Sequence, residues 1–152
     1  MKKVLVVMMF AFLGASVMAQ SNESEMFISV FQVEKKALLM DYLALNEVEA
    51  AAFWPIYEAY EAKRSEIAKR RIGLITRYAE QYEGLTSDQA DALVADTFKL
   101  RADKEKLEKD FYKKFKKAVG SIRSAQFLQF ERFVDTSIDA ELYENMPLVG
   151  EM

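Results

Sequence analysis

The sequence predicts an all-α protein: a long antiparallel helical hairpin with shorter flanking helices, three to four helices in the mature chain. The 152 residues include only two prolines and five glycines, so little interrupts regular helix. Apolar residues recur at spacings of three, four and seven along several segments, which is the period of an amphipathic helix. A short connection at residues 84–89 separates the two longest segments and forces them to run antiparallel.

The first two helices are predicted from apolar periodicity and from a capping signal. The first runs from about Glu25 to Tyr42. The second begins after Asn46, whose side-chain oxygen can accept a backbone N–H while Glu49 completes a capping box. Pro55 lies inside this second helix and predicts a kink, or a short separate segment that ends before Trp54.

The turn of the hairpin carries the clearest boundary signals. Gly84 suits a helix C-terminus, and Thr86 with Gln89 forms a second capping box that opens the third helix. The apolar stripes of the two long helices are interrupted by three cations, Arg64, Arg71 and Lys104. The hairpin therefore cannot bury both apolar stripes by itself. Either the flanking helices or a second copy of the chain must cover the apolar surface that remains.

The C-terminal part predicts one further helix. Gly120 ends the third helix, and Ser124 is expected to cap a fourth one. Pro147 ends the regular structure, after which the tail can turn back onto the bundle.

The N-terminus resembles an export signal. Lys2 and Lys3 precede an apolar stretch, and Ala19 ends a run of residues suited to cleavage, so residues 1–19 are expected to be a signal peptide. Residues 20–152 then form a single helical domain, associated with the membrane only through the signal peptide before cleavage. The chain has no cysteine, which excludes lipid attachment at a cysteine, disulfides and thiolate metal sites.

The residue types favour a binding protein over an enzyme. Histidine and cysteine are both absent, so the usual general bases and thiol nucleophiles are missing. Two carboxylate pairs, Glu105 with Glu108 and Asp135 with Asp139, have the spacing of one helical turn, but we interpret them as solvated faces. The four methionines after the signal are scattered. The sequence predicts no cofactor, no metal site and no nucleic-acid partner.

A candidate binding surface combines aromatic and basic residues. Residues 61–117 hold fifteen basic and eleven acidic side chains between two acidic flanks. Aromatic rings at helical spacing are usually core, but exposed rings beside lysines and arginines suit unfolded polypeptide. The residues concerned are Trp54, Tyr57, Tyr60, Arg70, Arg71, Phe111, Lys113, Phe115 and Lys117.

The segment Leu85-Thr86-Ser87-Asp88-Gln89 matches an LTxxQ motif, and Leu45-Asn46-Glu47-Val48-Glu49 and Ile122-Arg123-Ser124-Ala125-Gln126 are degenerate versions. Over residues 38–134 the chain resembles the Spy/CpxP-like periplasmic stress proteins. The resemblance implies a periplasmic, ATP-independent chaperone that holds unfolded or partly folded polypeptide on a helical cradle. The alternative is an envelope-stress adaptor or structural partner that docks one specific envelope protein.

Overall fold

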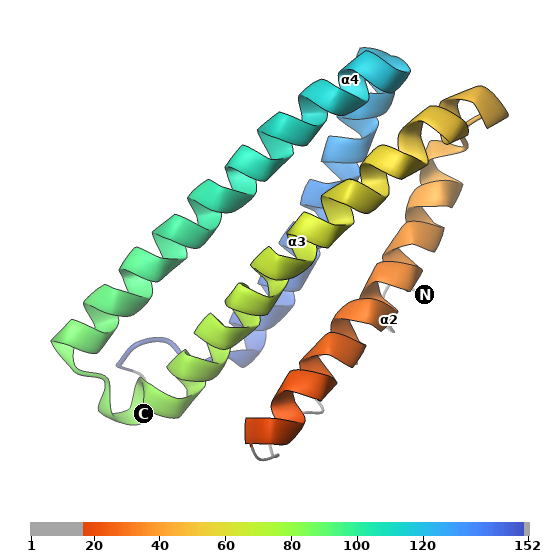
Figure 1. The fold of residues 1–152 in the computed structure, drawn as a ribbon. Coiled ribbons are helices and arrows are strands. Elements are labelled where there is room, and N and C mark those ends of the chain that lie inside the picture. Colours follow the sequence, from red (N-terminus) through yellow and green to blue (C-terminus); the bar gives the residue numbers. More distant parts are fainter. Residues whose placement is uncertain (1–16, 151–152) are drawn as a thin grey trace.

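The protein is all-α, as predicted. The computed structural model describes residues 17–150, with side chains from residue 25 onward. Helix α2 covers Val17–Leu43, α3 covers Glu47–Gln81, a 3-10 turn η1 covers Tyr82–Gly84, and α4 covers Ser87–Asn145. No strand occurs in this part of the chain. Figure 1 shows α2, α3 and α4 as long rods packed along their lengths.

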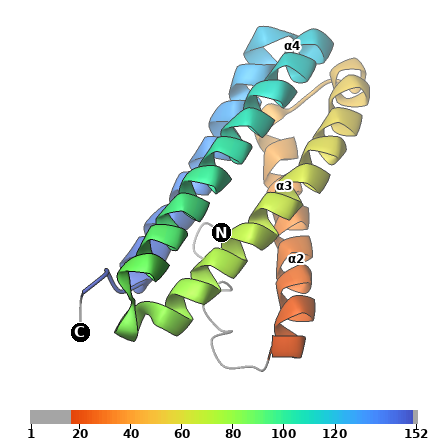
Figure 2. The same ribbon diagram turned by 60° about the vertical axis from the view of Figure 1, so that its left-hand side comes forward.

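Helix α4 consists of two antiparallel arms. Gly120, with φ 80° and ψ 172°, breaks the helical backbone and separates a first arm (residues 87–119) from a second arm (residues 121–145). This conformation is essentially restricted to glycine. The chain reverses there, so that four helical segments lie side by side (Figures 1 and 2). The predicted third and fourth helices correspond to these two arms.

Both predicted capping boxes are present. At the start of α3, the Glu49 N–H donates to Asn46 Oδ1 at 2.9 Å, and the Asn46 N–H donates to Glu49 Oε2 at 3.1 Å. At the start of α4, the Gln89 N–H donates to Thr86 Oγ1 at 3.3 Å, and the Thr86 N–H donates to Gln89 Oε1 at 2.9 Å. Each box satisfies backbone donors that the first helical turn leaves free.

Of the two alternatives predicted at Pro55, the separate first segment is wrong: α3 is one helix with Pro55 inside it, and Phe53 and Tyr57 on either side are buried in the core. The prediction for Ser124 was also wrong. Ser124 does not cap a helix: it is buried, and its hydroxyl donates to the Gly120 carbonyl oxygen at 2.7 Å. The tail does turn back, since the Tyr78 hydroxyl donates to the Pro147 carbonyl oxygen at 2.7 Å.

Helix α2 begins earlier than the predicted Glu25, at Val17. The expected cleavage position after Ala19 falls in its first turn, and residues 1–16 of the expected signal peptide lie outside the described residues. None of the helices in residues 17–150 is both long and apolar enough to cross a membrane.

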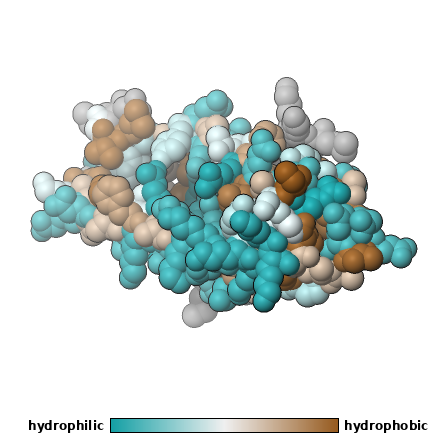
Figure 3. All heavy atoms as spheres, turned by 90° about the horizontal axis from the view of Figure 1, so that it is seen from above, coloured by the Kyte–Doolittle hydropathy of each residue, from teal (hydrophilic) through white to brown (hydrophobic). Residues whose placement is uncertain are grey.

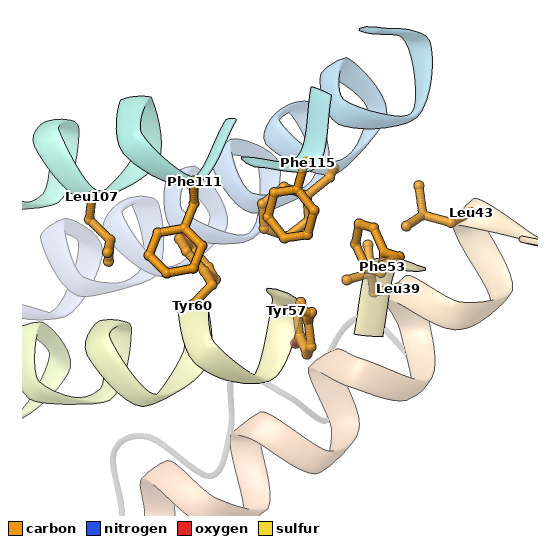
Figure 4. Packing of buried hydrophobic residues seen from close by; sticks show 9 residues of the cluster. Leu39, Leu43, Phe53, Tyr57, Tyr60, Leu107, Phe111 and Phe115 are labelled. Carbon is orange, nitrogen blue, oxygen red and sulfur yellow. The ribbon is translucent and has the colours of Figure 1, made fainter. Parts of the chain in front are cut away.

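An aromatic cluster forms the core at the end of the bundle where α2 joins α3. The ring of Phe115 lies 4.7 Å from that of Phe53 and 4.3 Å from that of Phe127, measured between centroids. Figure 4 shows Tyr60 of α3 beside Phe111 of the first arm and Phe53 near Phe115, whereas Tyr57 points toward α2. Leu39, Leu43 and Leu107 complete the cluster. All the helical segments therefore contribute side chains to one core.

The backbone of Gly120 generates a stability prediction. No atom lies within 4 Å of a Cβ built on Gly120 or on Gly73, so neither substitution causes a clash. Gly120→Ala forces alanine into a glycine conformation and is expected to lower the free energy of unfolding by about 1–3 kcal/mol. Gly73→Ala, inside α3, is the control and is expected to raise it by about 0.5–1 kcal/mol. Urea unfolding measures both, and equal effects of the two substitutions would contradict the assigned backbone break.

The aromatic cluster generates a second prediction. Phe115 is 0% exposed and Phe98, on the same arm, is 64% exposed. Phe115→Ala leaves a cavity and is expected to lower the free energy of unfolding by about 3–5 kcal/mol. Phe98→Ala is expected to change it by less than about 0.5 kcal/mol. Chemical denaturation of both variants tests the core, and a tolerated Phe115→Ala would show that this packing is absent in solution.

Candidate functional site

A network of charged side chains lies in the interior of the bundle. It alternates cations and carboxylates, and every helical segment contributes to it. Its members are Lys35 from α2, Glu61 and Arg64 from α3, Lys104 from the first arm of α4, and Glu131 and Asp135 from the second arm. Three cations balance three carboxylates, so the network is neutral when all six groups are ionised.

Glu131 is the centre of this network and is 0% exposed. Its Oε1 lies 2.9 Å from Lys35 Nζ, and its Oε2 lies 3.2 Å from Arg64 Nε. The Tyr60 hydroxyl also donates to Oε2, at 3.1 Å. One carboxylate therefore ties the second arm to both α2 and α3. Burial raises the pKa of Tyr60, and the Glu131 charge adds to this, so the hydroxyl keeps its proton as a donor.

Asp135 lies one turn further along the second arm and extends the network to the first arm. Its Oδ1 lies 2.9 Å from Arg64 Nη2, and its Oδ2 lies 2.5 Å from Lys104 Nζ. Burial by itself raises the pKa of Asp135, but the charges of Arg64 and Lys104 outweigh burial and lower it. Asp135 therefore stays ionised at neutral pH, as the pairing with two cations requires.

Glu61 has one cationic partner in the network, whereas Glu131 and Asp135 each have two. Its Oε1 lies 2.5 Å from Lys35 Nζ, whereas its Oε2 and the Tyr57 hydroxyl have no hydrogen-bond partner among the described residues. Burial raises the pKa of Glu61, and Lys35 offsets this only in part. Both groups border a shallow hollow between α2 and α3. The Glu61 charge is therefore the most weakly stabilised of the three carboxylates.

The sequence revealed half of this network. Arg64 and Lys104 were recognised as cations within apolar stripes, but Lys35, Glu61 and Glu131 were not singled out. Asp135 was interpreted as part of a solvated face, which is wrong because it is buried against two cations. A signal was present: Glu131 and Asp135 share the apolar stripe of Phe127, Val134 and Ile138, where charge needs a buried partner.

The other carboxylates of the two predicted pairs are also matched by cations. Asp139 lies 2.5 Å from Arg71 Nη2, and Glu105 lies 2.7 Å from Lys109 Nζ. Glu108 lies 3.6 Å from Arg132 and 4.0 Å from Lys104. Among residues 17–150 no group of three or more acidic side chains is placed to hold a metal ion. The arrangement suits holding helices together.

A largely apolar cleft opens beside the network. Helices α2 and α3 meet at their connection and diverge toward the N-terminal end of α2 (Figures 1 and 2). The cleft between them has a volume of ≈ 210 Å³, with Arg64, Lys104 and Asp135 of the network at its edge. Its apolar walls include Phe27, Ile28 and Phe31 from α2, Ile67, Ile72 and Ile75 from α3, and Val134 and Ile138 from the second arm.

This cleft is smaller than the ~300–1,000 Å³ of typical small-molecule pockets. It therefore suits one or two large apolar side chains. Arg71 also lines it, and its partly buried guanidinium lies 2.5 Å from Asp139. The cleft thus offers an apolar interior with an ion pair at its rim.

The predicted aromatic site residues are mostly core. Tyr57, Tyr60, Phe111 and Phe115 are buried in the aromatic cluster, so a binding surface built on these four rings is wrong for this conformation. Tyr60, Phe111 and Phe115 fill the space between α3 and α4, and the Tyr57 ring is covered by Lys35 of α2, with its hydroxyl at the hollow between α2 and α3. Trp54 is half-buried, and Lys36 Nζ lies 5.4 Å from the centroid of its ring.

The predicted basic site residues do not gather into one surface with the rings. Arg70 is exposed and lies 2.7 Å from Asp103. Lys113 and Lys117 are exposed at the far end of the first arm. The motif residues Leu45 and Leu85 are half-buried beside their capping boxes. Figure 3 shows a mostly hydrophilic end of the bundle with separate, small apolar patches.

Comparison with protein-family models, with curated proteins and with solved structures gives no match to this chain. The resemblance to the Spy/CpxP-like proteins therefore stays a prediction that depends on the motif residues alone.

The ion network generates a prediction that compares two buried carboxylates. Glu131→Gln leaves Lys35 and Arg64 without their shared charge and is expected to lower the free energy of unfolding by about 3–5 kcal/mol. Glu61→Gln is the matched control. It removes a charge that burial disfavours, and Lys35 retains Glu131, so its cost is expected to be less than half as large. Urea unfolding at pH 7 measures both, and a larger loss for Glu61→Gln would contradict the central place of Glu131.

Proposed function

We propose that this protein is an ATP-independent, chaperone-like protein of the periplasm that binds unfolded or partly folded polypeptide. The cleft between α2, α3 and the second arm of α4 is the proposed client site. The observation that carries the proposal is this cleft itself, whose walls are apolar side chains from three helical segments. Such a site binds apolar side chains that an unfolded client leaves exposed to water.

The attachment of α2 supports this choice of site. Leu39 and Leu43 fix the C-terminal half of α2 in the aromatic core. Toward its N-terminal end α2 diverges from α3, and its apolar residues Phe27, Ile28 and Phe31 line the cleft. A small outward movement of this half of α2 widens the cleft. Client segments of different shape can therefore be accommodated.

The net charge of the hairpin favours acidic clients. Residues 61–117 carry a net positive charge, although Arg71, which lines the cleft, is itself paired with Asp139. Segments that combine apolar and acidic residues are favoured, because long-range attraction raises their rate of encounter. Release follows when the client buries its own apolar groups and competes with the cleft, so no nucleotide is needed.

The alternative is an adaptor that docks one specific envelope protein through the same cleft. The two differ in selectivity. Affinity capture with the purified protein that enriches one partner in stoichiometric amount favours the adaptor. A spread of weakly held misfolded proteins favours the chaperone.

The proposal predicts that the purified protein suppresses aggregation of an unfolding client at a near-stoichiometric ratio without ATP. Ile72→Asp, in the cleft wall, is expected to weaken binding of a fluorescent apolar peptide about ten-fold or more, because a buried apolar side chain contributes ~1.5–3 kcal/mol. Val94→Asp, at an exposed position on α4, is the control and is expected to bind like the wild type.

Circular dichroism and urea unfolding check that both variants remain folded. If a several-fold excess of the protein does not suppress aggregation of the client, the proposed chaperone function is rejected. Suppression that is equal in the wild type and in folded Ile72→Asp leaves the function but rejects the cleft as its site.

A further inference from the structure

Helix α2 has a second apolar face, opposite the one that packs on the bundle. Its inner face carries Ile28, Phe31, Lys35, Leu39 and Leu43, all buried. On the other side, five residues form an exposed stripe that we name the outer seam: Met26, Val30, Val33, Ala37 and Met40. A helix at the surface of a single folded chain normally has a polar outer face.

The outer seam has the spacing of a coiled coil. Its residues follow one another at intervals of four, three, four and three, which is the alternation of a and d positions in a heptad repeat. Val30 and Ala37 occupy a positions, and Met26, Val33 and Met40 occupy d positions. Met26, Val30, Val33 and Met40 are 64%, 40%, 70% and 51% exposed. In Figures 1 and 2, α2 lies at the outside of the bundle.

The charged residues beside the outer seam can form ion pairs between two copies of the chain. Lys36 lies along one edge, at a g position, where its Nζ is 3.0 Å from Glu58 of α3 in an exposed ion pair. Glu34 and Asp41 lie along the other edge, at e positions. In a parallel, in-register pair, a g residue meets the e residue five positions later on the other helix, so Lys36 meets Asp41 of the second copy twice by symmetry. In an antiparallel pair, e residues face each other and these acidic groups repel.

We propose that two copies of this protein associate through their outer seams as a parallel, two-stranded coiled coil. The small side chain of Ala37 lets the two backbones approach closely. The seam spans residues 26–40, about 22 Å of helix at ~1.5 Å per residue. This is about two heptads, so the dimer is expected to be weak and to depend on concentration.

A lipid surface fits the outer seam less well. Helices that lie on membranes carry mainly lysine and arginine along their polar edge, whereas this edge includes Glu34 and Asp41. The seam also faces away from the cleft, which lies on the inner side of α2. The dimer therefore stands independently of the proposed client binding, and each copy keeps its cleft accessible.

Single cysteines test the pairing, because the chain contains none. Val33→Cys and Met40→Cys are each expected to form disulfide-linked dimers rapidly under mild oxidation, since a parallel pair brings each residue opposite its own copy. Val94→Cys, another exposed position outside the seam, is the control and is expected to cross-link only slowly. Analytical ultracentrifugation of the wild type is expected to show a monomer–dimer equilibrium.

The same variants distinguish the arrangements. In an antiparallel pair, Met40 faces Val30 of the second copy, and the two Met40 residues lie about 15 Å apart along the axis. This exceeds the ~7 Å between Cα atoms that a disulfide tolerates. Cross-linking of mixed Val30→Cys and Met40→Cys proteins, with Met40→Cys alone inactive, would therefore overturn the parallel geometry. Cross-linking no faster than Val94→Cys, together with a monomeric wild type, would overturn the interface itself.

A charge swap provides a second readout. Asp41→Lys places two lysines opposite each other and is expected to shift the equilibrium toward monomer, most strongly at low salt. Adding Lys36→Glu, together with Glu58→Gln to remove the carboxylate beside position 36, is expected to restore the dimer with the charges exchanged. Failure of this triple variant to recover, with Asp41→Lys already monomeric and folded, rejects the assigned pairing of Lys36 and Asp41.

Discussion

The carboxylate of Glu131 is the constraint around which the four helical segments are arranged. It is fully buried and contacts Lys35 of α2 and Arg64 of α3. A charge in this position is tolerated only with its partners in place, because an unpaired buried charge costs several kcal/mol. Apolar stripes can slide past one another by a turn at moderate cost, but this network cannot. We interpret it as the feature that fixes the register of the helices.

The network and the aromatic cluster divide the interior between them. The rings of Phe53, Phe115 and Phe127 close the end of the bundle where α2 joins α3, and the ion pairs follow along the same helices. Beyond Arg64 the packing against α2 becomes open, and the apolar cleft occupies this part. The closely packed end supplies stability. The open end holds the cleft proposed as the client site.

Helix α2 differs from the other segments because it is apolar on two opposite faces. The inner face provides Leu39 and Leu43 to the core and Lys35 to the network, while the outer seam is exposed. Apolar surface of this kind on both sides of one helix favours contacts beyond the single chain. The inner cleft and the outer seam are the two places where such contacts are proposed, and they do not compete for the same residues.

The sequence by itself determined the all-α class, both capping boxes, the hairpin turn and the break at Gly120, because these depend on local backbone preferences and on apolar period. It also showed that Arg64 and Lys104 interrupt apolar stripes. Only the tertiary structure decided that Tyr57, Tyr60, Phe111 and Phe115 are core and that Lys35, Glu61 and Glu131 form the network. Whether a ring or a charge is buried depends on what the neighbouring helix places opposite it, and residues some 70 positions apart, such as Tyr60 and Glu131, are joined only by the fold.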